Sequence, residues 1–149
     1  MSLRVLGNIS LNHEGKQEAI DNKVILNSWK FLSSNDFQVR FNASYVLMSC
    51  NIHLDGKKQT VNCVDANNNP VIIQKLIERL YDKEENLRTN VKAALLYISE
   101  LPLGFDKVIH ELRDKIKLLD EVFEEKGLKT LVHLLPKIEH YDDPLNLDQ

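Results

Sequence analysis

The 149-residue sequence has little of what marks loop-rich, disulfide-bonded or membrane-spanning proteins. Its five glycines and four prolines are too few for a disordered chain or a loop-rich β-sandwich. Two cysteines, Cys50 and Cys63, cannot build a disulfide scaffold. No apolar run approaches the roughly 20 residues that a bilayer requires, and the chain opens without a charged-then-apolar leader. We therefore expect a reduced, cytoplasmic protein.

A strong excess of either charge is also lacking. Nineteen basic residues stand against 22 acidic ones, which gives a net charge of -3. This balance argues against nucleic acid or an anionic membrane as an obligatory partner. The remaining composition, 43% hydrophobic and 28% charged, is typical of one globular domain.

Catalytic motifs are missing as well. The chain has no glycine-rich phosphate loop, no Gly-x-Ser-x-Gly and no His-Glu-x-x-His. Cys50, His53 and Cys63 have some of the chemistry of a zinc site, but structural zinc requires four ligands and no fourth is close in sequence. We expect a protein that is not an enzyme and that has no metal and no cofactor.

An internal repeat is the main positive signal. Residues 39–48 are similar to residues 87–96 at a constant offset of 48. The identical pairs are Arg40 and Arg88, Asn42 and Asn90, and Leu47 and Leu95. Residues 5–9 match residues 46–50 at a shorter offset of 41. The seven extra residues of the second interval fall near 62–70, where Asn-Asn-Asn-Pro indicates a lengthened loop.

Each copy of the repeat is predicted to be helical. Apolar residues at spacings of three and four predict helices over 24–32, 38–53, 71–80 and 87–101. Asp36 is the expected N-cap of the second of these helices. Gly15, Gly56 and Gly104 are each expected to end a helix in the left-handed C′ conformation. Because no segment alternates with period two, we predict an all-α fold.

A period in the low forties, with two substantial helices and a shorter leading one, resembles the armadillo or HEAT repeat. The predicted architecture is a right-handed α-solenoid of about two full repeats. Its expected divisions are a partial repeat (1–14), a repeat (15–56), a repeat with the lengthened loop (57–104) and a divergent helical cap with an acidic tail (105–149). Arg40 and Arg88 are interpreted as structural residues that start helices and bind carbonyl groups of a neighbouring repeat.

Both ends carry further expectations. Residues 1–14 are interpreted as part of a helix whose flanking helices are absent, so either the chain is a fragment or another subunit covers this end. The apolar residues expected to bind a partner there are Leu3, Val5, Leu6 and Ile9. In the cap, helices are expected over 109–123 and 128–135.

A concave groove lined by the third helices is the second predicted partner site. The residues expected to face it are Arg4, Asn8, Asn42, Tyr45, Ser49, Asn90, Ala93 and Tyr97. Armadillo importers bind basic peptides through a ladder of Trp and Asn at such positions. Only Asn8 keeps the ladder's amide here and no Trp remains, which argues against nuclear-import cargo.

Three junction segments narrow the resemblance. Residues 52–59 (IHLDGKKQ), 11–16 (LNHEGK) and 99–104 (SELPLG) resemble the repeat junctions of the radial spoke head 14 homolog family, which are armadillo proteins of the ciliary axoneme. The match covers about residues 3–110, and residues 111–149 depart from it. The family's members are longer, so the chain resembles their carboxyl-terminal part.

The resemblance implies a non-catalytic scaffold in the radial spokes of a cilium or flagellum. Its partners would be other spoke subunits of a large hetero-complex, and its location the axonemal cytoskeleton. A soluble armadillo adaptor remains the alternative. Such an adaptor would bind peptide segments in its groove and act in transport, adhesion or signalling.

Overall fold

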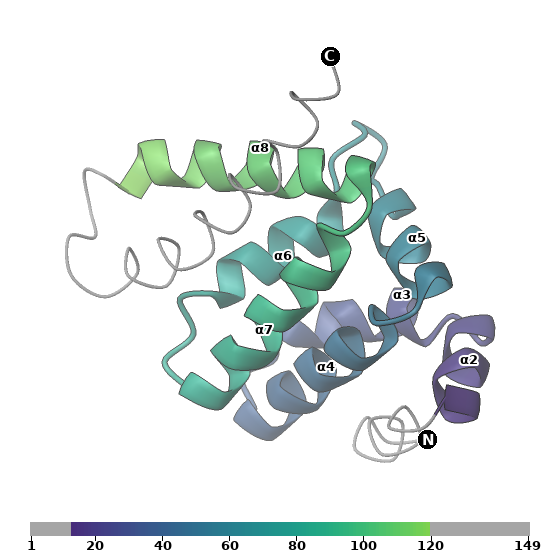
Figure 1. Ribbon diagram of the computed structural model, residues 1–149. Helices are drawn as coiled ribbons and strands as arrows, with labels where there is room; N and C mark the ends of the chain where they lie inside the picture. Colours follow the sequence, from purple (N-terminus) through teal and green to yellow (C-terminus); the bar gives the residue numbers. More distant parts are fainter. Residues whose placement is uncertain (1–12, 120–149) are drawn as a thin grey trace.

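The computed structural model describes residues 13–119, and the regular elements of this part of the chain are all helices (Figure 1). Its elements are α2 (His13–Asp21), α3 (Val24–Ser28), the 3-10 helix η1 (Trp29–Ser33), α4 (Phe37–Cys50), α5 (Leu54–Asn62), α6 (Val71–Arg79), α7 (Glu85–Ile98) and α8 (Pro102–Leu119). No strand forms between residues 13 and 119, so the predicted all-α class is confirmed for them.

The start of α4 depends on the predicted cap. The Asp36 carboxylate accepts hydrogen bonds from the backbone N–H groups of Gln38 at 2.8 Å and Val39 at 3.3 Å. These bonds satisfy two amide groups that the first turn of a helix leaves without partners. The expected N-cap is therefore confirmed.

The single helix predicted over 24–32 is an α-helix followed by a 3-10 helix. α3 runs for five residues and then tightens into η1 at Trp29. Such 3-10 turns are common where an α-helix ends. Lys23 connects α2 to α3 in the left-handed conformation, with φ at 58°.

The expected role of the glycines is wrong. Gly15, Gly56 and Gly104 lie inside α2, α5 and α8, and no glycine among the described residues has a positive φ. A Cβ atom on Gly56 would collide with the carbonyl group of Cys50, and one on Gly104 with that of Ile98. These two glycines therefore permit the close approach of two consecutive helices.

Side-chain hydrogen bonds are found at the carboxyl-terminal ends of α4 and α7, the helices that Gly56 and Gly104 were expected to end. α4 and α7 finish at Asn51 and Ser99, both in the right-handed conformation. Asn51 donates from its amide to the Leu47 carbonyl, and Ser99 donates from its hydroxyl to the Leu95 carbonyl, each at 2.7 Å. These bonds satisfy carbonyl groups of the last turn without a left-handed residue.

A loop over residues 63–70 separates α5 from α6. An antiparallel bridge between Val64 and Pro70 closes it. Inside, the Asp65 carboxylate accepts from the backbone N–H groups of Asn67 and Asn69 at 2.8 and 2.9 Å. Asn68 adopts a positive φ of 65°, a conformation that asparagine tolerates well.

α8 begins seven residues before the helix expected over 109–123. Pro102 occupies its first position, where a missing N–H group costs nothing. Leu112 is fully buried, as the pattern predicted. The rest of that prediction from residue 120 onward, together with the helix expected over 128–135, lies outside the described residues.

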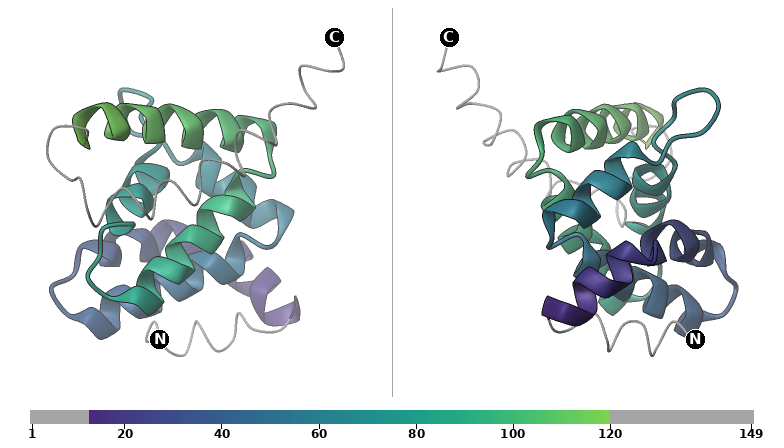
Figure 2. Two further views of the ribbon diagram at one scale, coloured as in Figure 1. Left: turned by 60° about the vertical axis from the view of Figure 1, so that its left-hand side comes forward. Right: turned by 90° about the vertical axis from the view of Figure 1, so that its right-hand side faces the viewer.

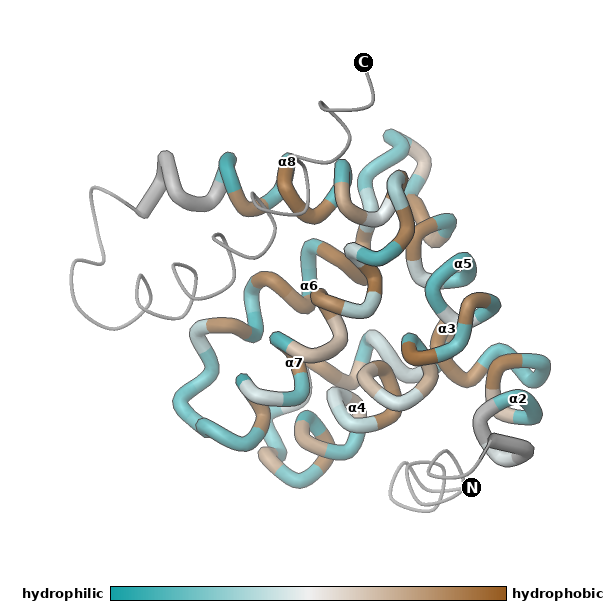
Figure 3. Tube along the Cα trace, in the orientation of Figure 1, coloured by the Kyte–Doolittle hydropathy of each residue, from teal (hydrophilic) through white to brown (hydrophobic). Residues whose placement is uncertain are grey.

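α4 and α7 lie side by side and run in the same direction (Figures 1 and 2). α4 also packs on η1, while α6 packs on α7, α8 and η1. Apolar and polar residues alternate along the helices, as expected for amphipathic helices around a shared core (Figure 3). The largest fully buried side chains are Ile20, Ile25, Leu32, Leu47, Ile72, Ile73, Leu76, Ile77, Leu80, Leu87, Leu95 and Ile98.

None of the helices in the described part of the chain is long and apolar enough to cross a bilayer.

Candidate protein-binding surface

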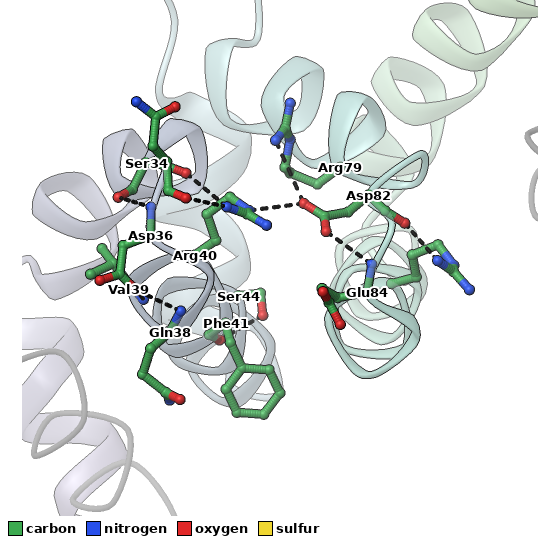
Figure 4. Close-up of polar contacts among 12 residues, drawn as sticks. Ser34, Asp36, Gln38, Val39, Arg40, Phe41, Ser44, Arg79, Asp82 and Glu84 are labelled. Atoms are coloured by element: carbon green, nitrogen blue, oxygen red, sulfur yellow. Dashed lines mark hydrogen bonds and ion pairs between the residues drawn. The ribbon is translucent and has the colours of Figure 1, made fainter.

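A buried ion pair joins the amino-terminal end of α4 to the loop before α7 (Figure 4). The Nε atom of Arg40 lies 3.0 Å from Oδ2 of Asp82, and both side chains are less than a tenth exposed. Nη1 of Arg40 donates to the carbonyl groups of Ser34 and Asn35 at 3.0 and 3.2 Å. Arg40 thus connects α4 to the backbone of residues 34–35 and to the side chain of Asp82. These contacts support its interpretation as a structural residue.

Arg88 occupies the matching place in α7. Its Nη1 atom donates to the carbonyl group of Asp82 at 2.6 Å. Arg40 binds the carbonyl of the residue six positions earlier, and Arg88 does the same. Each arginine thus binds carbonyl groups of its own copy of the repeat rather than of the neighbouring copy, and the contact between the copies is the ion pair of Arg40 with Asp82.

Other contacts recur at the offset of 48. The capping bonds of Asn51 and Ser99 are 48 residues apart, and so are the close approaches at Gly56 and Gly104. The backbone N–H groups of His53 and Leu101 donate to carbonyls three residues earlier, at 3.3 and 3.2 Å. The sequence repeat is thus accompanied by repeated local hydrogen bonding.

Two of the predicted groove residues are buried. Asn90 is 9% exposed and donates from its amide to the Ser44 hydroxyl at 3.1 Å, across the α4–α7 interface. Ser49 is 2% exposed. Neither side chain is available to a peptide, because each is enclosed by the chain itself.

The other described groove residues remain partly accessible. Asn42, Tyr45, Ala93 and Tyr97 are all half-buried. Ala93 and Tyr97 follow Asn90 at i+3 and i+7, and so lie on the side of α7 nearest α4. The Asn42 carbonyl oxygen accepts a bond from the Gln38 amide at 3.2 Å. For these four positions partner binding stays a prediction.

Six of the predicted residues cannot be placed. The groove residues Arg4 and Asn8, and the amino-end residues Leu3, Val5, Leu6 and Ile9, lie outside the described part of the chain.

The structure adds a surface that the sequence pattern did not reveal, here named the α4 strip. It consists of Phe37, Phe41, Tyr45 and Met48 on α4 and of Ile52 in the turn after it, spaced by four, four, three and four residues. Phe37 and Ile52 are 36% and 42% exposed, and the three residues between them are half-buried. The rings of Phe37 and Phe41 lie 5.9 Å apart.

The apolar residues of the α4 strip are present in the sequence, but the sequence does not separate them from the core residues of the same helix. α4 has apolar residues on its core side at Ala43, Val46, Leu47 and Cys50, and that side accounts for the predicted helix. Leu54, four residues after Cys50, has the spacing of the same core side, yet it begins α5 and is 53% exposed. A helix that is apolar on two sides is expected to be covered on both.

The remaining polar features of the described residues lie mainly around one pocket. An open pocket of about 240 Å³ lies between the 63–70 loop and α8. Its Lys107 amine donates to the Val61 carbonyl at 2.8 Å, and its Glu111 accepts from Gln74 at 3.3 Å. Between residues 13 and 119 no group of three or more His, Cys, Asp or Glu side chains could hold a metal ion.

Burial shifts two titratable groups outside this pocket. It raises the pKa of the Cys63 thiol, an effect that Lys30 partly offsets. It also raises the pKa of Tyr81 to about 12.

No protein-family model matches the chain, and none of the curated proteins compared with it is significantly similar.

Proposed function

We propose that the chain is a non-catalytic, armadillo-type α-solenoid that serves as a scaffold subunit of ciliary radial spokes. The observation that carries the solenoid proposal is the recurrence of structural contacts at the offset of the sequence repeat. Arg40 and Arg88 bind carbonyls in the same way, and α4 and α7 end and turn in the same way. In this proposal α4 and α7 are the third helices of consecutive repeats.

The arrangement of α4 and α7 supports a role in binding proteins. Helices of consecutive repeats that lie side by side present a continuous extended surface. Tyr45 and Tyr97 are partly exposed on that surface, and aromatic residues contribute strongly to protein interfaces. Tyr45 belongs to the α4 strip, whose end residues Phe37 and Ile52 are exposed apolar side chains. The amino-end residues 3–9 form the second proposed contact.

Localisation and extraction test the radial spoke proposal. We expect a tagged full chain to incorporate along ciliary axonemes and to remain bound when detergent-treated axonemes are washed in high salt. Replacing Tyr45 and Tyr97 together by alanine is expected to release it into the wash, because aromatic anchors are lost. Replacing the exposed Leu103 by alanine is the control and is expected to leave it bound. A chain found wholly in the soluble fraction would contradict the proposal.

A soluble adaptor is the second candidate. The partial exposure of Asn42, Tyr45 and Tyr97 on one face favours it, because an adaptor uses such side chains to hold partner segments reversibly. The same fractionation distinguishes the two functions. An adaptor is expected in the cytosolic pool with partners that exchange, whereas a scaffold is expected in the salt-resistant axoneme.

A further inference from the structure

We infer that the α4 strip binds an amphipathic α-helix of a partner protein rather than an extended peptide. The inference rests on the proposed function only in that the chain binds other proteins. It specifies the chemistry and the conformation of the bound segment. Three properties of the strip support it: its shape, its charge and the state of its hydrogen-bonding groups.

The shape of the strip is that of a ridge along one helix. Phe37, Phe41, Tyr45 and Met48 recur at spacings of three and four and so follow one side of α4, and Ile52 lies in the turn that follows the helix. With a rise of about 1.5 Å per residue the helical part of the ridge is roughly 16 Å long, which is about three helical turns. Ridges of this kind pack into the grooves between side chains of another helix. A partner helix with apolar residues at i, i+3, i+4 and i+7 has the matching surface.

The strip has no exposed charge. Between Phe37 and Ile52 the only charged residue is Arg40, which is buried and paired with Asp82. A basic or acidic peptide would therefore lose hydration without gaining an ion pair. The complementary surface is itself uncharged and apolar.

Carboxylates stand at the two ends of the strip. Exposed Asp36 precedes Phe37, and exposed Asp55 follows Leu54. Lys57 is buried and paired with Glu100 at 3.0 Å, which leaves Lys58 as the exposed base near the second end. A partner helix with basic residues beyond its apolar stripe complements this distribution of charge.

The amide side chains of Asn42 and Asn90 each already make one hydrogen bond within the chain. An extended peptide must find partners for its backbone N–H and C=O groups. Asn90 donates to Ser44, Asn42 accepts from Gln38, and Ser49 is buried. A bound helix satisfies its own backbone groups and needs no such ladder. The face around α4 therefore fits a helix better than an extended segment.

Selection from a displayed library of random 18-residue peptides against the full chain tests the inference. We expect the enriched peptides to carry apolar residues at i, i+3, i+4 and i+7 with Lys or Arg outside that stripe. Circular dichroism is expected to show that a synthetic copy gains helicity when the chain is added. Enrichment of proline-containing or extended basic peptides, or of no peptide at all, would overturn the inference.

Variants locate the bound peptide on the strip. Phe37→Asp combined with Ile52→Asp is expected to weaken binding by about tenfold or more, because both apolar ends are lost. Phe37 and Ile52 are well exposed and Phe37 opens α4, where an acidic residue is favourable, so the fold is expected to persist. Leu103→Asp is the matched control, because Leu103 is an exposed apolar residue on a different helix, α8. This variant is expected to bind normally. Equal binding by both variants would overturn the assignment to the strip.

The outcomes separate this inference from the proposed function. Helical peptides that bind the strip support the inference whether or not the chain enters axonemes. Extended peptides at the same surface would contradict the inference, while the proposal of a protein-binding scaffold would stand.

Discussion

Asp82 lies at the junction of α6 and α7, and its carboxylate reaches back 3.0 Å to the guanidinium of Arg40 on α4. The same carboxylate accepts from the backbone N–H of Glu84 at 3.1 Å, and Arg79 approaches it at 3.6 Å. One buried acid therefore joins the amino-terminal ends of α4 and α7.

Removing this acid is expected to destabilise the chain strongly. Asp82→Ala leaves the buried Arg40 without its counter-charge, which costs about 3–5 kcal/mol of unfolding free energy. The double variant Arg40→Met with Asp82→Leu is expected to recover most of that loss, because no buried charge remains. Urea denaturation measures both variants. If Asp82→Ala is as stable as the unchanged chain, the Arg40–Asp82 ion pair does not hold the helices together.

The glycines in α5 and α8 provide a second prediction. Gly56→Ala and Gly104→Ala are each expected to cost about 1–3 kcal/mol, because the added Cβ meets a carbonyl group of the preceding helix. Asparagine is expected to be as harmful as alanine. At a left-handed C′ position asparagine would be tolerated instead. Thermal unfolding of the alanine and asparagine variants therefore distinguishes close approach from a left-handed cap.

The cap of α4 gives a third prediction. Asp36→Ala is expected to lower the unfolding free energy by about 0.5–2 kcal/mol, because two amide groups of the first turn lose their acceptor. Asp36→Asn keeps an acceptor oxygen and is expected to recover most of the stability. Asp106→Ala, an exposed aspartate on α8, serves as the control in denaturant titrations. An Asp36→Ala variant that matches this control would contradict the capping role.

The raised pKa of Tyr81 predicts a loss of stability at high pH. Its pKa is raised from 10.0 to about 12 by burial, so the native state holds the phenol proton more tightly than the unfolded state. This contribution to stability is complete below pH 10 and is lost as the pH rises through about 12. We expect ultraviolet titration of the phenol groups to show a late component that Tyr81→Phe removes. A late component that persists in Tyr81→Phe would belong to another tyrosine.

The features that the sequence predicted well are those decided within a few residues. An N-cap needs an acceptor side chain two or three residues before free amide groups, and Asp36 was identified on that ground. The helices of the second copy follow from the spacing of their apolar residues. Arg40 was recognised as structural because it begins a helix and recurs as Arg88.

The features that were missed depend on which elements meet in space. Gly104 has the sequence context of a helix end, but its real constraint is the carbonyl of Ile98 on the preceding helix. Asn90 has the spacing of a groove residue, yet α4 packs against it. The apolar residues of the α4 strip could not be separated from core residues, because α4 is apolar on two sides.

Cross-linking mass spectrometry of intact, salt-washed axonemes that contain the full chain tests the central claim most directly. The account predicts cross-links from Lys58, an exposed base six residues after Ile52, to helical segments of radial spoke subunits. It also predicts that these cross-links disappear in the Phe37→Asp, Ile52→Asp variant and persist in Leu103→Asp. Axonemes that contain the chain but give no cross-link to any spoke subunit would contradict it.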